Sequence, residues 1–516
     1  MLAPALLVSA CAATLPPLRN RIITTVIDDA SPTTLSRAVA DATAEHAGET
    51  GIQILARPLD AFAARVVLAG AAQRSLDIQY YIWHADRTGM LMFNEIWKAA
   101  ERGVRVRLLL DDLSTAGLDR ILSALDAHEH IEVRLYNPIV QRRTRWLAFL
   151  TDFGRLNRRM HNKSFTADNA VTIVGGRNIG DEYFGVDDDI LFADLDVVAA
   201  GAVVNDVSTQ FDAYWNSRSS YPVARLIRAA TPAWKAALLD RFAAARVDSA
   251  STAYIRAADQ TPLVANLESR APVLQWSRAE LVHDDPSKTT DFTPSEESLL
   301  FPEMMRAAGR PGQTFDLVSP YFVPMQGGTT TLANLVTDGV RVRVLTNSLA
   351  ATDVAAVHAG YVKWRRKLLK AGVEIYEFHP AATQDAVTPN RRSGRASSWG
   401  ASRSRAPLGL HAKTFAVDSA RLFIGSFNFD PRSAMFNTEL GLVLHSPSLA
   451  RQLHGEFDNA VPSMAFEVIL GAGGRGIQWI ELGPRGETLH RTEPHASIFR
   501  RAFVSVLKFF PLDWLL

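Results

Sequence analysis

The stretch His161-Asn-Lys-Ser-Phe-Thr-Ala-Asp168 recurs later in the chain as His411-Ala-Lys-Thr-Phe-Ala-Val-Asp418. In both copies a lysine follows the histidine by two positions, and an aspartate follows the lysine by five. Downstream, Gly175-Gly-Arg-Asn178 corresponds to Gly425-Ser-Phe-Asn428 at the same distance from the histidine. The duplication predicts two half-sites that meet across one active centre.

Each copy combines side chains that suit the chemistry of a phosphodiester. The His-x-Lys triplets are expected to be β-strand, where side chains two residues apart share a face. The small Gly175-Gly176 and Gly425-Ser426 pairs are expected to let the backbone approach a ligand, beside the amides of Asn178 and Asn428. Together the halves offer two imidazoles, two ammonium groups and two carboxamides for an in-line displacement. This is no metal cage, so we expect no metal and no cofactor.

The two motifs resemble the HxKxxxxD signature of the phospholipase D superfamily, with its trailing GG/GS-x-N. Over most of its length the chain is further similar to the bacterial cardiolipin synthases, especially the C-type branch. The similarity also includes Asp77–Trp83, Asp111-Asp112, Asp284–Lys288, Ser319–Phe322, Thr346–Leu349, His358–Tyr361 and Glu493-Pro494. The resemblance implies a duplicated fold with one active site at the interface of its halves.

Length and pattern agree with a two-domain α/β protein. The 516 residues, 47% of them hydrophobic, can fill two cores. Strand, helix and buried strand follow one another in each half, and the phrases Arg102–Arg107 and Asp338–Arg343 repeat, which predicts two mixed or parallel sheets flanked by helices. The expected divisions are a signal peptide and lipobox region (1–20), an N-terminal domain (45–220), a helical or irregular connection (221–313) and a C-terminal domain (314–516).

The resemblance also implies a role for each motif residue. His161 would attack phosphorus and form a phosphatidyl-histidine, while His411 would protonate the departing alcohol and later activate the incoming one. The symmetry of the sequence leaves the exchange of these two roles open. The non-bridging oxygens would be held by a shared set of donors, namely Lys163, Lys413, Asn178 and Asn428, with Ser426 as a further hydroxyl donor.

Four acidic residues are expected to support the site. By resemblance, Asp196 and Glu439 would each accept a proton from the histidine of their own half and fix its tautomer. Ordinary surface ion pairs are the alternative for these two acids. Asp168 and Asp418, although part of the catalytic motif, are expected to bind backbone and the opposite half rather than substrate.

The charge of the chain argues against one class of partner. A formal net charge of +1 does not suit a globally basic nucleic-acid-binding protein, so no nucleic acid is expected. Arginines nevertheless gather before each motif, and they are Arg142, Arg143, Arg145, Arg155, Arg158 and Arg159, then Arg391, Arg392, Arg395, Arg403 and Arg405. Either these are solvated loops, or they attract an anionic membrane surface, with aromatic residues at headgroup depth.

The N-terminus indicates a place in the bacterial cell envelope. The apolar stretch Leu2–Ala10 runs into Cys11, the single cysteine of the chain, as in a lipobox with a lipidated cysteine. No Lys or Arg precedes this stretch, so a merely apolar terminus is the alternative. We expect a membrane-associated protein that is anchored through Cys11.

Transphosphatidylation is the predicted activity, making cardiolipin from phosphatidylglycerol and a second phospholipid such as phosphatidylethanolamine. Hydrolysis to phosphatidic acid is the alternative, and a nuclease or a non-enzymatic membrane adaptor fits the sequence less well. The pattern identifies no protein partner.

Near the C-terminus, Ser497–Phe510 has apolar residues at helical spacing, typical of a helix that either docks on the second domain or lies in the headgroup layer.

Overall fold

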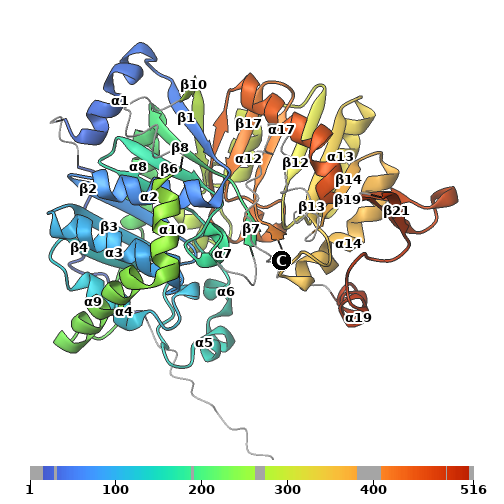
Figure 1. The fold of residues 1–516 in the computed structure, drawn as a ribbon. Coiled ribbons are helices and arrows are strands. Elements are labelled where there is room, and N and C mark those ends of the chain that lie inside the picture. Colours follow the sequence, from blue (N-terminus) through green and yellow to red (C-terminus); the bar gives the residue numbers. More distant parts are fainter. Residues whose placement is uncertain are drawn as a thin grey trace, which may run out of the picture.

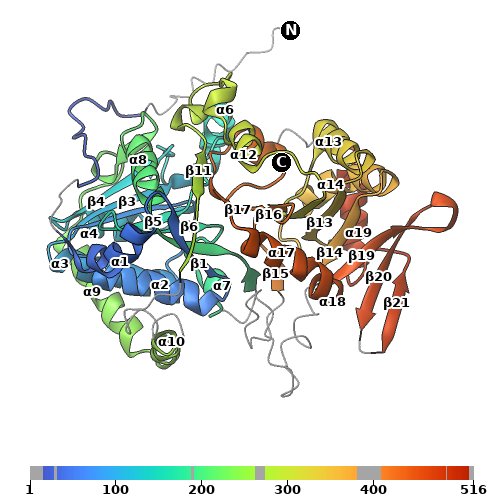
Figure 2. The same cartoon turned by 90° about the horizontal axis from the view of Figure 1, so that it is seen from above.

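The protein consists of two α/β halves, each built around one large sheet. The computed structural model describes residues 15–27, 32–186, 191–261, 274–379, 408–483 and 485–510. In Figure 1 the N-terminal half (blue to green) lies beside the C-terminal half (yellow to red), and Figure 2 shows the same pairing from above. Cys11 and the second arginine group (Arg391 to Arg405) lie outside the described residues.

The first sheet is mixed, because it contains both parallel and antiparallel neighbours. Its nine strands, in spatial order, are β10 (Gln275–Ser277), β1 (Thr50–Leu55), β8 (Asp196–Gly201), β6 (Val171–Gly175), β5 (Ser164–Ala167), β2 (Ser75–Tyr80), β3 (Arg105–Asp111), β4 (Ile131–Tyr136) and β9 (Ser220–Pro222). The neighbours β2, β3 and β4 run parallel. Their side chains are mostly buried on both faces, which accounts for the continuous apolar runs of the sequence.

The second sheet repeats this arrangement and extends it at one edge. Its ten strands are β11 (Ala279–His283), β18 (Leu440–Leu444), β17 (Arg421–Gly425), β16 (Thr414–Val417), β12 (Thr314–Val318), β13 (Arg341–Asn347), β14 (Glu374–Phe378), β19 (Ala465–Leu470), β20 (Ile477–Gly483) and β21 (Gly486–His490). A short parallel pair, β7 (Leu191–Ala193) and β15 (Leu408–Leu410), joins the halves. The predicted α/β class with two mixed sheets is confirmed.

Helices cover both sheets. In the first half they are α1 (Thr34–Glu45), α2 (Pro58–Ala71), α3 (Arg87–Glu101), α4 (Asp119–Asp126), α5 (Arg145–Thr151), α6 (Phe153–Leu156), α7 (Asp181–Phe184), α8 (Val203–Trp215), α9 (Pro232–Val247) and α10 (Ser249–Asp259). In the second half they are α12 (Leu300–Ala308), α13 (Met325–Thr337), α14 (Ala355–Lys370), α16 (Pro431–Met435), α17 (Pro447–Asn459), α18 (Val461–Met464) and α19 (Ile498–Leu507). Among these described helices, none combines the length and the apolar character that crossing a bilayer requires.

One apolar core crosses the boundary between the halves. Val174 and Val197 of the first sheet pack in the same buried cluster as Ile424 and Leu442 of the second. Helix α8 covers the first sheet beside this contact, and α17 covers the second. The two halves therefore share a continuous interior, and this fixes how their motifs face each other.

The connection over 221–313 differs from the prediction in its second part. Helices α9 and α10 occupy the first part, as expected. However, β10 pairs with β1 in the first sheet, and β11 pairs with β18 in the second. The chain therefore passes from one half to the other between β10 and β11, well before residue 314. Short edge strands of this kind carry too little sequence pattern to be recognised.

Candidate active site

The histidine of each motif lies just before a strand, on a segment that the other half holds. His161 and Lys163 precede β5, and His411 and Lys413 precede β16, so the ladder begins one residue after each predicted His-x-Lys strand. The His161 N–H donates to the Thr438 carbonyl at 2.8 Å. In the equivalent place, the His411 N–H donates to the Ala193 carbonyl at 2.8 Å. At both histidines, the backbone is thus held by a hydrogen bond to the other half rather than by a neighbouring strand of its own sheet.

The histidine side chains are also held from the opposite half. Nδ1 of His161 lies 2.7 Å from Oε2 of Glu439. Nδ1 of His411 lies 2.5 Å from Oδ2 of Asp194. Because each carboxylate occupies Nδ1, it directs Nε2 of the ring as the reactive nitrogen. All four side chains are buried, and the imidazoles are 7% exposed, so little water competes for them.

The expected pairing of each histidine with an acid of its own half is wrong. Asp196 instead accepts hydrogen bonds from Arg65 at 2.9 Å and from the Arg177 N–H at 3.1 Å. The sheet register explains the error, since Gly175 pairs with Asp196 whereas Gly425 pairs with Gly441. The acids equivalent by register are therefore Asp194 and Glu439, two residues before the paired position. A loop of different length in the two halves hid this relation in the sequence.

The small residues after each motif make room for these acids rather than for a ligand. A Cβ at Gly176 would lie 2.2 Å from Oδ1 of Asp194. In the other half, the Ser426 hydroxyl donates to Oε2 of Glu439 at 2.5 Å, and Ser433 donates to Oε1 at 2.8 Å. The structure thus places Ser426 on the carboxylate, where the sequence predicted a phosphate donor.

The two asparagines lie beside the histidines but differ in their contacts. Asn178 accepts from the Ile82 N–H at 3.2 Å and donates to the Tyr183 hydroxyl at 3.0 Å. Asn428 is 4% exposed, and its Oδ1 has no hydrogen-bond partner. Tyr183 also packs its ring against His411, with centroids 5.3 Å apart. Asn428 is thus the better placed of the two to receive a new polar ligand.

Asp168 and Asp418 have equivalent structural roles outside the reactive centre. Both have positive φ angles, 54° and 52°, at the turn after the motif strand. The Asp168 carboxylate accepts backbone N–H groups of residues 73–75, and Asp418 accepts those of residues 312–314. The predicted backbone binding is present, but each aspartate binds the chain entering β2 or β12 of its own half, not of the other.

Burial and neighbouring charges shift the pKa values of the lysines and carboxylates of the site. Burial lowers the pKa of Lys163 to about 7 and that of Lys413 to about 8. Burial raises the pKa of Glu439 to about 7. The pKa of Asp194 lies below its usual value, because the attraction of His411 and other cations outweighs the effect of burial. The two acids therefore differ in charge near neutral pH.

The two imidazoles both favour the neutral form. Burial, followed by repulsion from Lys163 and Lys413, lowers the pKa of His161 well below its ordinary value. Burial and Lys413 also lower the pKa of His411, but Asp194 opposes this shift. The charges of Lys413 and His411, in the second motif, thus act on the pKa of His161, in the first.

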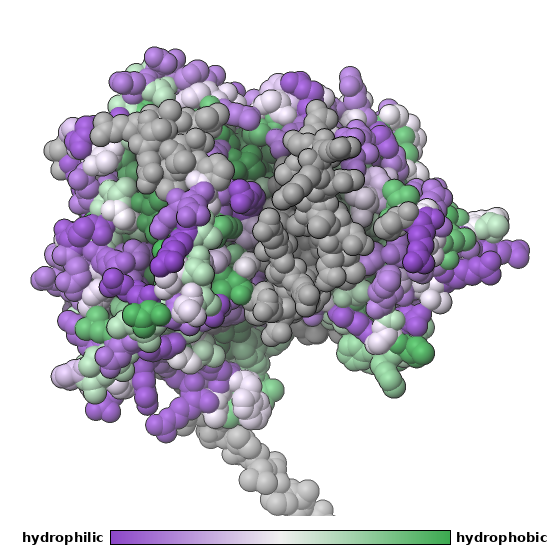
Figure 3. Space-filling model, viewed as in Figure 1, coloured by the Kyte–Doolittle hydropathy of each residue, from purple (hydrophilic) through white to green (hydrophobic). Residues whose placement is uncertain are grey.

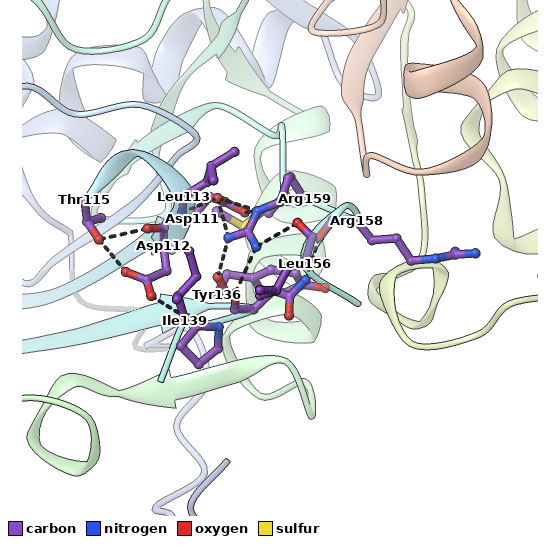
Figure 4. Close-up of polar contacts among 12 residues, drawn as sticks. Asp111, Asp112, Leu113, Thr115, Tyr136, Ile139, Leu156, Arg158 and Arg159 are labelled. Carbon is purple, nitrogen blue, oxygen red and sulfur yellow. Dashed lines mark hydrogen bonds and ion pairs between the residues drawn. The ribbon is translucent and has the colours of Figure 1, made fainter. Parts of the chain in front are cut away.

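A buried ion pair fixes the chain that leads into His161 (Figure 4). The Arg159 guanidinium donates to the Asp111 carboxylate, and both side chains are fully buried. Asp111 also accepts the Met160 N–H at 2.9 Å. Figure 4 shows Arg158 directed away from this pair. The geometry of His161 thus depends on an acid at the end of β3, a supporting role that the motif itself does not reveal.

A second buried ion pair holds the backbone of Glu439. Asp284 accepts from the Lys288 ammonium at 2.9 Å and from the Glu439 N–H at 2.8 Å. Lys288 also donates to the Ser433 carbonyl at 2.9 Å. In the sequence, the segment Asp284–Lys288 is notable only for its similarity to the cardiolipin synthases. In the structure, its ion pair holds the backbone of Glu439.

The first arginine group is not a solvated loop, and its attraction to an anionic membrane surface stays a prediction. Most of its guanidinium groups are bound internally, as shown by the pairs Arg142–Asp112, Arg145–Asp112, Arg155–Asp152, Arg158–Lys288 carbonyl and Arg159–Asp111. The apolar residues among them behave otherwise, since Trp146 is 67% and Leu150 is 74% exposed. Exposed apolar side chains therefore remain beside the paired arginines.

Within the described residues, two groups of side chains could hold a metal ion, and neither includes a residue of the duplicated motifs. They are His84, Asp86 and Glu182, and His379, Glu481 and His495.

Tyr81, which lies outside the duplicated motifs, packs its ring against His161 with centroids 4.8 Å apart. Sequence analysis could have identified Tyr81 only through its place within Asp77–Trp83, a segment that resembles the cardiolipin synthases.

Comparisons with known proteins agree with this geometry. A family model described as "Cardiolipin synthase, PLD-like domain" matches residues 67–215 and 303–461. Cardiolipin synthase C of Escherichia coli (strain K12) is 44% identical over 485 residues, covering 93% of this chain and 99% of the relative. An uncharacterized protein of Helicobacter pylori (strain J99) is 31% identical over 433 residues, 82% of each chain. The phosphatidylserine synthase structure of Haemophilus influenzae Rd KW20 shares the fold, with a TM-score of 0.55, 13% identity and coverage of 93% and 100%.

Proposed function

Because the chain belongs to the cardiolipin synthase family of phospholipase D-like proteins, we propose that it makes cardiolipin by transferring a phosphatidyl group between phospholipids. The observation that carries this proposal is the pair of histidines, each bonded at Nδ1 to an acid of the opposite half. That arrangement leaves two Nε2 atoms for one phosphodiester, as a two-step displacement requires. Phosphatidylglycerol is the acceptor, and phosphatidylglycerol or phosphatidylethanolamine is the donor.

The first step forms a covalent phosphatidyl-enzyme. Nε2 of His161 attacks phosphorus, and the bond between phosphorus and the headgroup oxygen breaks. His411, whose imidazolium is stabilised by Asp194 and by the anionic phosphodiester, gives its Nε2 proton to that oxygen, so the headgroup leaves as a neutral alcohol. Lys163 and Lys413 offset the charge that builds on the non-bridging oxygens, with Asn428 as an additional donor. This charge also raises the pKa of both lysines towards the ordinary range when substrate binds.

The second step returns the enzyme to its starting state. A hydroxyl of the acceptor phosphatidylglycerol gives its proton to His411, and its oxygen attacks phosphorus. The bond between phosphorus and Nε2 of His161 breaks, which releases cardiolipin. Two phosphatidylglycerol molecules thus yield cardiolipin and glycerol, while a phosphatidylethanolamine donor yields cardiolipin and ethanolamine.

The electrostatics support His161 as nucleophile and His411 as acid. The pKa of His161 is the more strongly depressed, by burial and then by the lysines, and a nucleophile must be unprotonated. His411 lies against Asp194, whose lowered pKa keeps it ionised, and an ionised partner stabilises an imidazolium. Sequence symmetry left the roles exchangeable, whereas the unequal acids favour one order.

The test measures lipid products from vesicles of phosphatidylglycerol, with and without phosphatidylethanolamine. Mass spectrometry should detect cardiolipin together with one glycerol or one ethanolamine per turnover. Water as acceptor is the runner-up chemistry, and phosphatidic acid as the sole product would establish a hydrolase instead. The histidine variants described in the Discussion serve as inactive controls.

Access to lipid would come from exposed apolar side chains on α5 and α19. Helix α19 packs on α14 by a narrow face, with Val504 buried against Leu349 and Ala359. The other face is open, since Phe499 is 88% and Phe509 is 81% exposed. Both helices lie on the lower side of the molecule in Figure 1, and Figure 3 shows hydrophobic side chains over α19 at the lower right. The helix thus combines the two alternatives that its sequence left open.

Matched substitutions separate docking on protein from docking on lipid. Changing Phe499, Phe503 and Phe509 to Ser should reduce binding to phosphatidylglycerol vesicles, while melting temperature and turnover of a soluble short-chain lipid persist. The control Val504→Ser should lower the melting temperature instead. Unchanged vesicle binding by the triple variant would refute the membrane role of α19.

Lipidation of Cys11 supplies a second attachment and places the protein in the cell envelope. The support is the apolar stretch that precedes this single cysteine. Cys11→Ala should prevent incorporation of labelled fatty acid and leave the precursor unprocessed. Labelling that persists in the variant would remove this part of the proposal.

A further inference from the structure

Three histidines converge on one glutamate at the outer edge of the second sheet. Glu481 lies on β20, His379 follows β14, His490 ends β21, and His495 precedes α19. Nε2 of His379 lies 3.0 Å from Oε1 of Glu481. Nε2 of His490 and Nε2 of His495 lie 2.7 and 3.4 Å from Oε2. Three imidazoles from separate parts of the chain thus surround the two carboxylate oxygens of Glu481.

Three of these residues, His379, Glu481 and His495, are spaced closely enough to hold a metal ion. Zinc with nitrogen and oxygen ligands at about 2.0–2.1 Å places neighbouring ligand atoms about 3.3 Å apart in a tetrahedron. The ligand atoms of His379, Glu481 and His495 all lie within 4.8 Å of one another. Tetrahedral coordination would require these three ligand atoms to move closer together, and Nε2 of His490, which lies 2.7 Å from Oε2 of Glu481, to join them as the fourth ligand.

The surrounding structure restrains the ligands in this arrangement. The Phe466 ring stacks on His379 with centroids 4.6 Å apart and on His495 at 5.7 Å. The His379 N–H also donates to the Met464 carbonyl at 2.9 Å. His495 has a φ of 54°, a left-handed conformation that is uncommon for any residue except glycine. Packing and an unusual backbone conformation thus hold the imidazoles over Glu481.

The ligand types indicate which ion would bind. Three imidazoles and one carboxylate suit zinc and its borderline neighbours, whereas magnesium and calcium favour sites made of oxygen alone. The carboxylate of Glu481 would also attract a divalent cation by its charge. Hydrogen bonds alone are the competing explanation, since neutral imidazoles also donate to a carboxylate.

We propose that His379, Glu481, His490 and His495 form a binding site for one zinc-class divalent cation. The ion would fasten the β20–β21 hairpin and the segment before α19 to the end of β14. It would act on the position of α19 and on stability, and it would take no part in phosphoryl transfer. The proposal goes beyond the synthase activity and does not depend on it.

The experiment uses the full chain after treatment with a chelator. Calorimetric titration with Zn²⁺ should show one site per chain, and Co²⁺ should give the visible spectrum of a tetrahedral complex. Glu481→Gln should weaken Zn²⁺ binding by more than about 100-fold, since even supporting residues around a metal often cost 10–100-fold. Zn²⁺ should raise the melting temperature of the wild type but not of this variant.

The matched control is His445→Ala, because His445 also bonds a single glutamate, Glu280, at 2.7 Å and has no such cluster. It should bind Zn²⁺ as the wild type does. The double variant His379→Ala/His495→Ala, whose folding is checked by circular dichroism, should lose the site. Undiminished binding by the double variant, or no stoichiometric binding by the wild type, would overturn the proposal. Loss of turnover of a soluble short-chain lipid in the chelated, still folded wild type would show that the ion acts in catalysis, contrary to its assigned role.

Discussion

The two half-sites share a histidine and a lysine but surround their carboxylates differently. Glu439, which binds His161, accepts hydrogen bonds from the hydroxyls of Ser426 and Ser433. Asp194, which binds His411, has instead the positive charge of Arg177 among the influences that lower its pKa. Burial raises the pKa of Glu439 to about 7, because the attraction of Lys163 and the hydrogen bonds from the two hydroxyls offset burial only in part. A symmetric motif thus contains an electrostatic asymmetry that can assign different tasks to two identical side chains.

The largest expected effect separates the two histidines. His161→Ala should reduce kcat by at least about 10⁴-fold and abolish transfer of label from phospholipid to protein. His411→Ala removes only acid and base catalysis, so it should cost about 10²–10⁴-fold and allow labelled enzyme to accumulate. Rapid-quench labelling with a radioactive phospholipid measures both. Label that maps to His411 would reverse the comparison.

The acids should follow with unequal effects. Asp194→Asn should lower kcat by roughly 10³–10⁴-fold, because the ionised carboxylate orients and charges its histidine. Glu439→Gln should cost about tenfold less, since Glu439 already shares a proton near pH 7. Asp196→Asn is the control that removes a buried acid without touching a histidine, and its loss should appear in melting temperature. Equal kinetic losses for Asp194 and Glu439 would show that the asymmetry has no catalytic meaning.

Substitutions of the residues beside Asp194 and Glu439 test the same difference between the half-sites, with smaller expected losses of activity. Gly176→Ala would place a methyl group 2.2 Å from Asp194, which must shift away from His411, so we expect a loss of about 10²-fold in kcat. Ser426→Ala removes one hydrogen bond to Glu439 and should cost about tenfold. Steady-state kinetics on vesicles, with melting temperatures as a check on folding, compare the two. A harmless Gly176→Ala would contradict the close approach of Asp194.

The smallest effect is a shift of the pH profile. Since burial lowers the pKa of Lys163 to about 7 and of Lys413 to about 8, both lose protons as pH rises, and kcat/KM should fall above that range. Asp194 raises the pKa of Lys413, so Asp194→Asn should move this alkaline limb to lower pH. An alkaline limb near 10.5, the ordinary lysine value, would exclude these lysines as the titrating groups.

The sequence revealed the elements of this site better than their partners. The motif spacing predicted the two sheets and located His161, Lys163 and their counterparts, because short-range spacing survives in a single strand and turn. It misassigned Asp196, since a loop of different length separates the equivalent acids Asp194 and Glu439. The exchange of these acids between halves depends on contacts across the interface, which no local pattern records. The internal pairing of the arginines escaped for the same reason, since their partners lie on other elements.

The exchange of carboxylates also has a consequence for how the enzyme fails. Neither half contains a complete histidine–acid pair, so both pairs form only when the halves dock, as at the self-complementary interface of a two-fold dimer. A slight separation of the halves would disconnect both pairs together while each sheet kept its own core. Heat inactivation would therefore precede the loss of secondary structure, and activity would report the seating of one half on the other.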